Sequence, residues 1–136
     1  MFSVVREIHF SYGHRLMDYV GKCRHPHGHN GRVEVELSRP RLNRLGMVMD
    51  FDEIKKRLQT WIDAHLDHQM ILRRDDPLVA VLRKMGEPFY LMTENPTAEA
   101  LAREIYGAAA TQGLPVTRVT VWETEKSHST YRAAAR

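Results

Sequence analysis

The sequence predicts an α+β fold in which an antiparallel sheet carries its helices on one face. Two alternating apolar segments come first, two amphipathic helical segments follow, and two β-branched segments close the chain. Strands and helices that occur in separate runs are typical of this class. Since 136 residues suffice for one hydrophobic core, we expect a single domain over residues 1–136.

The first two predicted strands both bring histidines to an apolar face. The first segment has an apolar or aromatic residue at every second position and ends on His14. The second alternates apolar with polar, mostly charged residues over 32–38. Because residues two apart in a strand point to the same side, His27 and His29 join that face if the register runs back through Gly31. A bulge at Gly31 would break this register.

Two long helices are predicted from capping residues and apolar spacing. Asp50 and Asp52 offer an N-cap to the first, and residues 67–68 close it. The second begins at residues 95–97, with a cap residue and a proline at its first position, and residues 113–115 stop it. Both helices have apolar residues at helical spacing, and the order of strands and helices along the chain indicates that both pack on one face of the sheet.

The remaining segments give weaker signals. Residues 69–93 include a turn at 73–77 and a short helix over 78–84. A strand is expected over 116–123, and a final short strand over 130–133.

Composition limits the classes of function. The formal charge of +3 and pI near 9.2 favour an anionic partner, either nucleic acid or a small phosphorylated molecule. The basic residues form no block and no aromatic-basic interleaving, which argues against nucleic acid. One cysteine allows no internal disulfide, the N-terminus is no secretory signal, and no segment is long enough for a membrane span, so we expect a cytoplasmic protein.

A Cys-x-x-x-His-x-His run is the strongest chemical signal. It places the single cysteine, Cys23, shortly before His27 and His29, and His14 ends the preceding strand. Three neutral imidazoles would bind zinc with a fourth position open, which polarises a substrate oxygen and leaves the thiol of Cys23 free to move a proton. The alternative is a closed structural site in which the thiol is a ligand and no catalysis occurs.

Two further positions have chemical potential. Asp67 beside His68 at a helix end can orient an imidazole for acid–base work, although a surface pair of this kind usually has no function. Glu123 continues the apolar face of a predicted strand, where a carboxylate is costly unless paired. It is either a strand-end residue that reaches solvent or an acceptor for two N–H groups of a heterocycle.

These motifs together resemble the 6-pyruvoyl-tetrahydropterin synthase family, especially its bacterial carboxy-forming branch, which serves queuosine synthesis. The matching segments run in the family's order and span nearly the whole chain: residues 10–16, 23–29, 50–51, 66–68, 94–99 and 122–124. The resemblance implies a tunnelling fold, with a four-stranded antiparallel sheet and two long helices on one face. It also implies assembly into a barrel, commonly a hexamer built from two trimers, with active sites between subunits.

The resemblance also implies residue roles. His14, His27 and His29 would bind Zn²⁺. Cys23 would be the catalytic base, with Asp67 and His68 completing a proton relay. Glu123 would anchor a pterin ring, helped by groups near Thr97 of a neighbouring subunit.

The implied reaction converts 7,8-dihydroneopterin triphosphate to 6-carboxy-5,6,7,8-tetrahydropterin, with release of triphosphate and acetaldehyde. Formation of a 6-pyruvoyl product from the same substrate is the first alternative, and a non-catalytic, zinc-stabilised pterin-binding module is the second. Basic residues such as Arg15, Lys22 and Arg24 suit a triphosphate. The chain departs from the family in a longer connection between His68 and Asn95, which leaves its substrate choice open.

Overall fold

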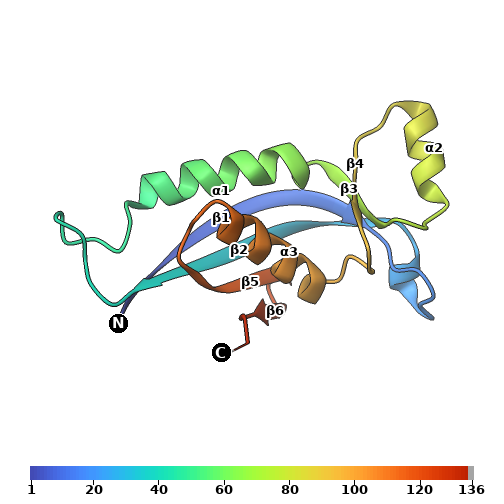
Figure 1. Ribbon diagram of the computed structural model, residues 1–136. Helices are drawn as coiled ribbons and strands as arrows, with labels where there is room; N and C mark the ends of the chain where they lie inside the picture. The colour runs from blue at the N-terminus through green and yellow to red at the C-terminus, as the bar shows by residue number, and fades with distance from the viewer. Residues whose placement is uncertain (135–136) are drawn as a thin grey trace.

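The structure, a computed structural model, describes residues 1–134 and contains one mixed sheet of six strands. Figure 1 shows the sheet as a long curved layer with two of its helices on one side. The strands are β1 (Phe2–His14), β2 (His27–Arg39), β3 (Gln69–Arg73), β4 (Phe89–Met92), β5 (Val116–Thr124) and β6 (Ser127–Tyr131). The helices are the short 3₁₀ turn η1 (Lys22–Arg24), α1 (Phe51–His65), α2 (Leu78–Met85) and α3 (Ala98–Thr111).

The strand order β4-β3-β1-β2-β5-β6 corrects the expected four-stranded sheet. Strands β1, β2, β5 and β6 pair antiparallel as expected, but β3 and β4 add two parallel strands at the β1 edge. Both extra strands come from residues 69–93, whose apolar runs are too short for a period to be recognised. The last strand, β6, also begins earlier than the expected residues 130–133.

The pairing of β1 with β2 is continuous over both strands. Phe10 lies opposite Gly31, Tyr12 opposite His29, and His14 opposite His27, so no bulge interrupts the ladder at Gly31. The predicted register is therefore confirmed. It places the three histidines on the same face as the apolar residues of both strands.

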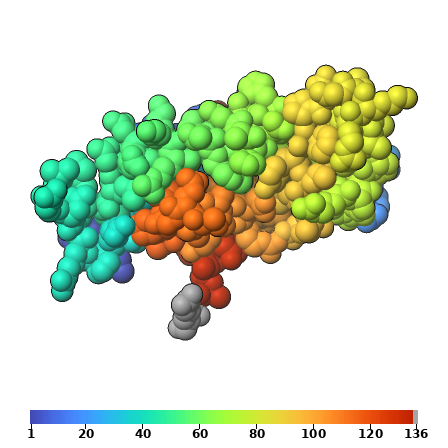
Figure 2. Space-filling view, turned by 45° about the horizontal axis from the view of Figure 1, so that its top comes forward, coloured from blue at the N-terminus to red at the C-terminus, as the bar shows by residue number. Residues whose placement is uncertain are grey.

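Helices α1 and α3 cover that apolar face, and Figure 2 shows their surfaces side by side. Asp50 caps α1, since its side chain accepts a hydrogen bond from the amide of Asp52 at 2.8 Å. The expected start of the second long helix was wrong by a few residues. Thr97 is the N-cap of α3, and Pro96 precedes the helix instead of occupying its first turn.

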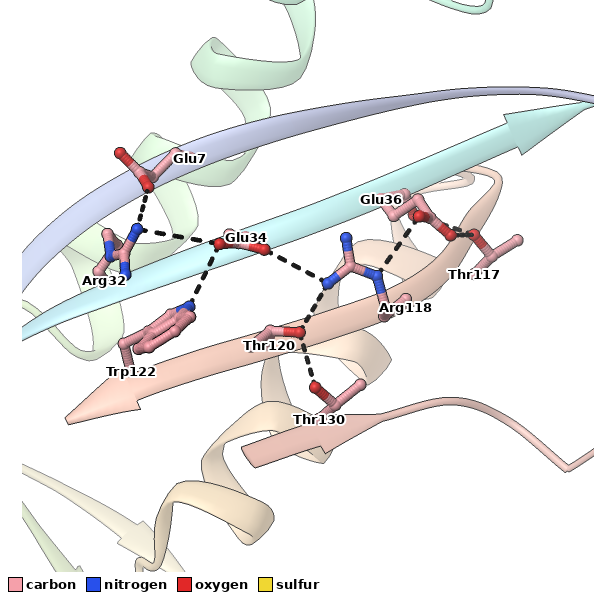
Figure 3. A network of polar contacts seen from close by, with 9 residues as sticks. All are labelled: Glu7, Arg32, Glu34, Glu36, Thr117, Arg118, Thr120, Trp122 and Thr130. Carbon is pink, nitrogen blue, oxygen red and sulfur yellow. Dashed lines mark hydrogen bonds and ion pairs between the residues drawn. The ribbon is translucent and has the colours of Figure 1, made fainter. Parts of the chain in front are cut away.

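The opposite face of the sheet is lined with charged and polar side chains. Figure 3 shows Arg118 at the centre of this network, where it donates to Glu34 and Glu36 at 3.3 Å each. Arg118 also donates to Thr120 at 2.7 Å, and the Trp122 indole donates to Glu34 at 3.2 Å. Alternation along β2 and β5 thus separates an apolar face from a polar face.

The long connection after His68 is anchored to the segment that follows β1. Arg15 donates from Nε to Asp76 at 2.8 Å, and the Asp76 side chain is 0% exposed. Burial alone would raise the pKa of Asp76, but hydrogen bonds from Arg15 and from the Leu78 amide hold it below its ordinary value. Arg15 is therefore paired inside the chain. Within residues 1–134, no helix is long and apolar enough to cross a membrane.

We expect replacement of Asp76 by alanine to lower the free energy of unfolding by about 3 kcal/mol, because it leaves the Arg15 guanidinium without its buried partner. Asp75→Ala is the matched control, since the Asp75 side chain is 65% exposed and pairs with Arg73 at the surface. It should cost much less, because exposed ion pairs contribute little to stability. Urea denaturation of both variants measures the difference, and equal losses would contradict the anchoring role of Asp76.

Candidate metal and active site

Three histidines meet where β1 ends and β2 begins. One ring nitrogen of each of His14, His27 and His29 lies within 4.8 Å of the other two. Nε2 of His14 is 3.0 Å from Nε2 of His27, and Nε2 of His29 is buried without a hydrogen-bond partner. The two-residue period of β2 and the pairing of β1 with β2 produce this convergence, as the sequence predicted.

Backbone carbonyls fix the orientation of two of these rings. Nδ1 of His14 donates to the carbonyl of Pro96 at 2.7 Å, and Nδ1 of His27 donates to the carbonyl of His25 at 2.7 Å. A proton held on Nδ1 leaves the Nε2 lone pair of each ring directed at the other histidines. Metal-binding histidines are commonly held in the same way by an outer acceptor.

Burial favours the neutral form of two of these imidazoles, His14 and His29. His14 is 3% exposed, and its burial, with the nearby His27 and His29 rings, lowers its pKa to about 4 despite the bond to Pro96. Burial also lowers the pKa of His29. Neutral nitrogens with no protein partner are the form in which histidine binds a metal, so the three residues could hold one divalent ion.

Cys23 lies close to His14 but on a different segment. It sits in η1, half-buried, and its carbonyl accepts a hydrogen bond from the Leu16 amide at 2.9 Å. Cys23 and His14 both line a cavity of about 350 Å³, here called the Cys23 cavity. Cys23 and His14 thus border the same space.

The carboxylate of Asp67 orients the imidazole of His68. His68 donates from Nδ1 to Asp67 at 2.8 Å, and the other carboxylate oxygen of Asp67 accepts the Ser11 amide at 2.9 Å. The His68 amide donates to the Ser11 carbonyl at 2.7 Å, and the His68 backbone is left-handed, with φ of 58°. The His68 side chain is 80% exposed, so its Nε2 is available to a molecule outside the chain.

The structure does not bring Cys23 and His68 into one cavity. His68 lines a second space of about 660 Å³ together with His27 and His29, here called the His68 cavity. The histidine cluster borders both cavities, because His14 lines the first, and His27 and His29 the second.

Glu123 and Thr97 lie together in the Cys23 cavity. Glu123 is half-buried near the end of β5, and its carboxylate makes no hydrogen bond or ion pair within the part of the chain that the structure describes. The Thr97 hydroxyl accepts the Ala100 amide at 3.1 Å, which leaves its own proton free to donate. Glu123 and Thr97 of one chain therefore border the same cavity.

Several residues of the site were not predicted. Ser127, His128 and Ser129 line the Cys23 cavity from β6, and no motif in the sequence indicates them. The side chain of Asn95 accepts the Met17 amide at 2.8 Å and donates to the Met17 carbonyl at 2.9 Å. This contact joins the segment that carries Cys23 to the start of α3. The motif around residues 94–99 pointed to this region without giving the role of Asn95.

Comparison with known proteins identifies relatives over the full length of the chain. The profile of the family described as 6-pyruvoyl tetrahydropterin synthase matches residues 3–134. The 6-carboxy-5,6,7,8-tetrahydropterin synthase of Rickettsia typhi is 38% identical over 104 residues, which cover 75% of each chain. The enzyme of the same name from Synechocystis sp. is 33% identical over 136 residues, covering 96% of this chain and 93% of its own.

Solved structures show the same fold. An uncharacterized protein from Wolinella succinogenes superposes with a TM-score of 0.80, at 27% identity and 98% coverage of both chains. The 6-pyruvoyl tetrahydropterin synthase of Caenorhabditis elegans gives a TM-score of 0.73 at 25% identity, covering 98% of this chain and 96% of that one. The fold is thus that of known tetrahydropterin synthases.

We expect the metal-free protein to lose stability as the pH falls from 6.5 towards 4. In this range the unfolded chain protonates His14, but the folded chain, with a pKa of about 4, does not. Protons therefore favour the unfolded state, by about 3 kcal/mol once the pH is near 4. Urea denaturation at each pH, with a chelator present, measures the loss.

The variant His14→Gln should have a smaller acid-induced loss, while His9→Gln, which alters a side chain that is 70% exposed, should behave like the unmodified protein. Identical pH dependence in the unmodified protein and His14→Gln would contradict this assignment.

Proposed function

The chain belongs to the 6-pyruvoyl tetrahydropterin synthase family, and on that premise we propose that it converts 7,8-dihydroneopterin triphosphate and one water to 6-carboxy-5,6,7,8-tetrahydropterin, triphosphate and acetaldehyde. Its relatives of 33% to 38% identity carry the name of this enzyme. The reaction would serve queuosine synthesis in the cytoplasm.

The histidine cluster supports this function most directly. Mutually close nitrogens on His14, His27 and His29, with His14 buried and neutral, fit a zinc ion held by three imidazoles, with a fourth position left for substrate. Bound zinc would polarise the substrate's side-chain hydroxyls and so favour removal of a proton from the neighbouring carbon. The cluster borders the cavity that holds the other proposed residues.

Glu123 and Thr97 would bind the pterin ring. An unpartnered carboxylate in a cavity of about 350 Å³ matches the adjacent amino and ring N–H groups of a pterin, which can donate two parallel hydrogen bonds to it. The free hydroxyl proton of Thr97 adds a donor to the same wall. Both residues would fix the ring so that its side chain points at the metal.

Cys23 would act as the base. Its thiol shares a cavity with His14, so it can reach a carbon next to a hydroxyl that the metal polarises. Asp67 and His68 would return the proton, because the Asp67 carboxylate holds the His68 ring with Nε2 outward. Arg15 is a poor candidate for the triphosphate because Asp76 already neutralises it, so Lys22 and Arg24 remain the basic residues nearest to Cys23 in the sequence.

The complete site would form between subunits. Cys23 and His68 of one chain line different cavities, and the His68 side chain is 80% exposed. A neighbouring copy would bring its Asp67–His68 pair to the Cys23 cavity in a symmetric assembly. This fits the barrel expected of a tunnelling-fold domain, in which hexamers of two trimers are common.

The zinc-loaded protein should turn over 7,8-dihydroneopterin triphosphate, and Cys23→Ala should reduce kcat by at least about 100-fold while keeping zinc content and thermal stability, since it removes only the base. Mass spectrometry of the pterin product and an acetaldehyde assay measure the reaction. Ser3→Ala, an exposed change far along β1, is the control.

Other results of this experiment point to the alternatives. A 6-pyruvoyl product without acetaldehyde would show the pyruvoyl-forming reaction, which the C. elegans structural neighbour carries in its name. Loss of zinc in Cys23→Ala would make the thiol a ligand. This loss of zinc, together with no turnover by the unmodified protein, would favour a zinc-stabilised binding module.

Mixing two inactive variants tests the shared site. Cys23→Ala and His68→Ala should each be inactive alone, and partial activity should return when they are unfolded, combined and reassembled. Some mixed interfaces then pair an intact Cys23 with an intact His68. Activity that stays absent after mixing, with reassembly verified by light scattering, would contradict a site shared between copies.

A further inference from the structure

Tyr12 lies against the histidine cluster with its side chain almost fully buried. The residue is 3% exposed, and its ring centroid is 5.2 Å from that of His14 and 5.6 Å from that of His29. Phe10 stacks on its other side at 5.0 Å. The Tyr12 ring therefore packs against the rings of His14 and His29.

Because Gly31 has no side chain, the Tyr12 ring can lie over it. A Cβ at Gly31 would lie 3.0 Å from Cε1 of Tyr12 and 3.1 Å from Cε1 of Phe10, closer than real Cβ contacts usually come. The Tyr12 ring thus extends from β1 across β2.

Glu123 lies on β5, the strand next to β2 in the sheet. It lines one cavity with His14 and another with His29, and these are the two histidine rings that Tyr12 contacts. Burial, and secondly the negative charge of Glu123, raise the pKa of the Tyr12 hydroxyl, which is consistent with the two groups being near each other. Tyr12 and Glu123 therefore lie around the same two histidines.

The hydroxyl of Tyr12 is buried and has no hydrogen-bond partner within residues 1–134. A buried donor without an acceptor destabilises a fold, and phenylalanine would fill the same volume without that cost. The nearby Glu123 carboxylate is an acceptor without a donor. A hydrogen bond between them would satisfy both groups.

We propose that Tyr12 is a positioning residue for Glu123: its hydroxyl donates a hydrogen bond to the Glu123 carboxylate and so orients it for the paired N–H groups of a pterin. The inference rests on the proposed function. The hydroxyl is too deeply buried to reach a ligand itself, and it acts only through the carboxylate. A hydrogen bond to one face of the carboxylate restricts its rotation before the ligand arrives, which lowers the entropy lost on binding.

The Kd for neopterin, measured from the fluorescence of this ligand, tests the effect of Tyr12 on binding. Tyr12→Phe should raise the Kd for neopterin about ten- to a hundred-fold, as expected for loss of a hydrogen bond to a charged group. Zinc content should stay unchanged. Tyr106→Phe is the matched control, because the Tyr106 hydroxyl donates to the Val116 carbonyl at 3.1 Å and Tyr106 lines neither the Cys23 cavity nor the His68 cavity. An unchanged Kd in Tyr12→Phe, or loss of zinc from it, would overturn the proposal.

Infrared difference spectra of the zinc-loaded protein without ligand test the contact itself. The carboxylate band that disappears in Glu123→Gln should shift in Tyr12→Phe and stay in place in Tyr106→Phe. An unshifted band in Tyr12→Phe would overturn the proposal. If the unmodified protein binds no neopterin, the proposed function fails, and the infrared band alone then decides whether Tyr12 holds Glu123.

Discussion

The antiparallel pairing of β1 with β2 is the constraint on which the rest of the site depends. It aligns His14 with His27 and Tyr12 with His29, so that two separate stretches of chain present their rings to the same space. Slippage by one residue would turn the histidines of one strand to the charged face of the sheet. The apolar residues farther along both strands, buried under α1 and α3, oppose that slippage because it would expose them.

Burial determines the chemistry of the cluster as much as distance does. His14 lies under the start of α3, where the Pro96 carbonyl accepts its Nδ1 proton and solvent is excluded. A protonated ring would be costly there, so the imidazole stays neutral and its Nε2 remains a base. The protein thus holds nitrogen lone pairs in a position where their most favourable partner is a cation.

The residues around the cluster divide the site into two halves. One half holds Cys23, Thr97 and Glu123, and it is tied together by Asn95 and by the segment after β1. The other holds the Asp67–His68 pair, exposed at the surface beside the parallel strands. The turn between β3 and α2 also supplies Asp76, which anchors Arg15 next to His14. Residues 69–93, which form a longer connection than expected, therefore stabilise the loop that carries Cys23.

The sequence by itself determined the features that repeat at short range: the alternating strands, the two amphipathic helices, and three histidines on one face. Each follows from a local period of two or 3.6 residues. It did not determine the six-stranded mixed sheet, since parallel pairing of β3 and β4 depends on partners far along the chain. The orphaned Tyr12 hydroxyl and the separation of Cys23 from His68 were also decided only by the tertiary structure. Burial and proximity between distant segments have no signal in local spacing, because they arise when whole layers pack.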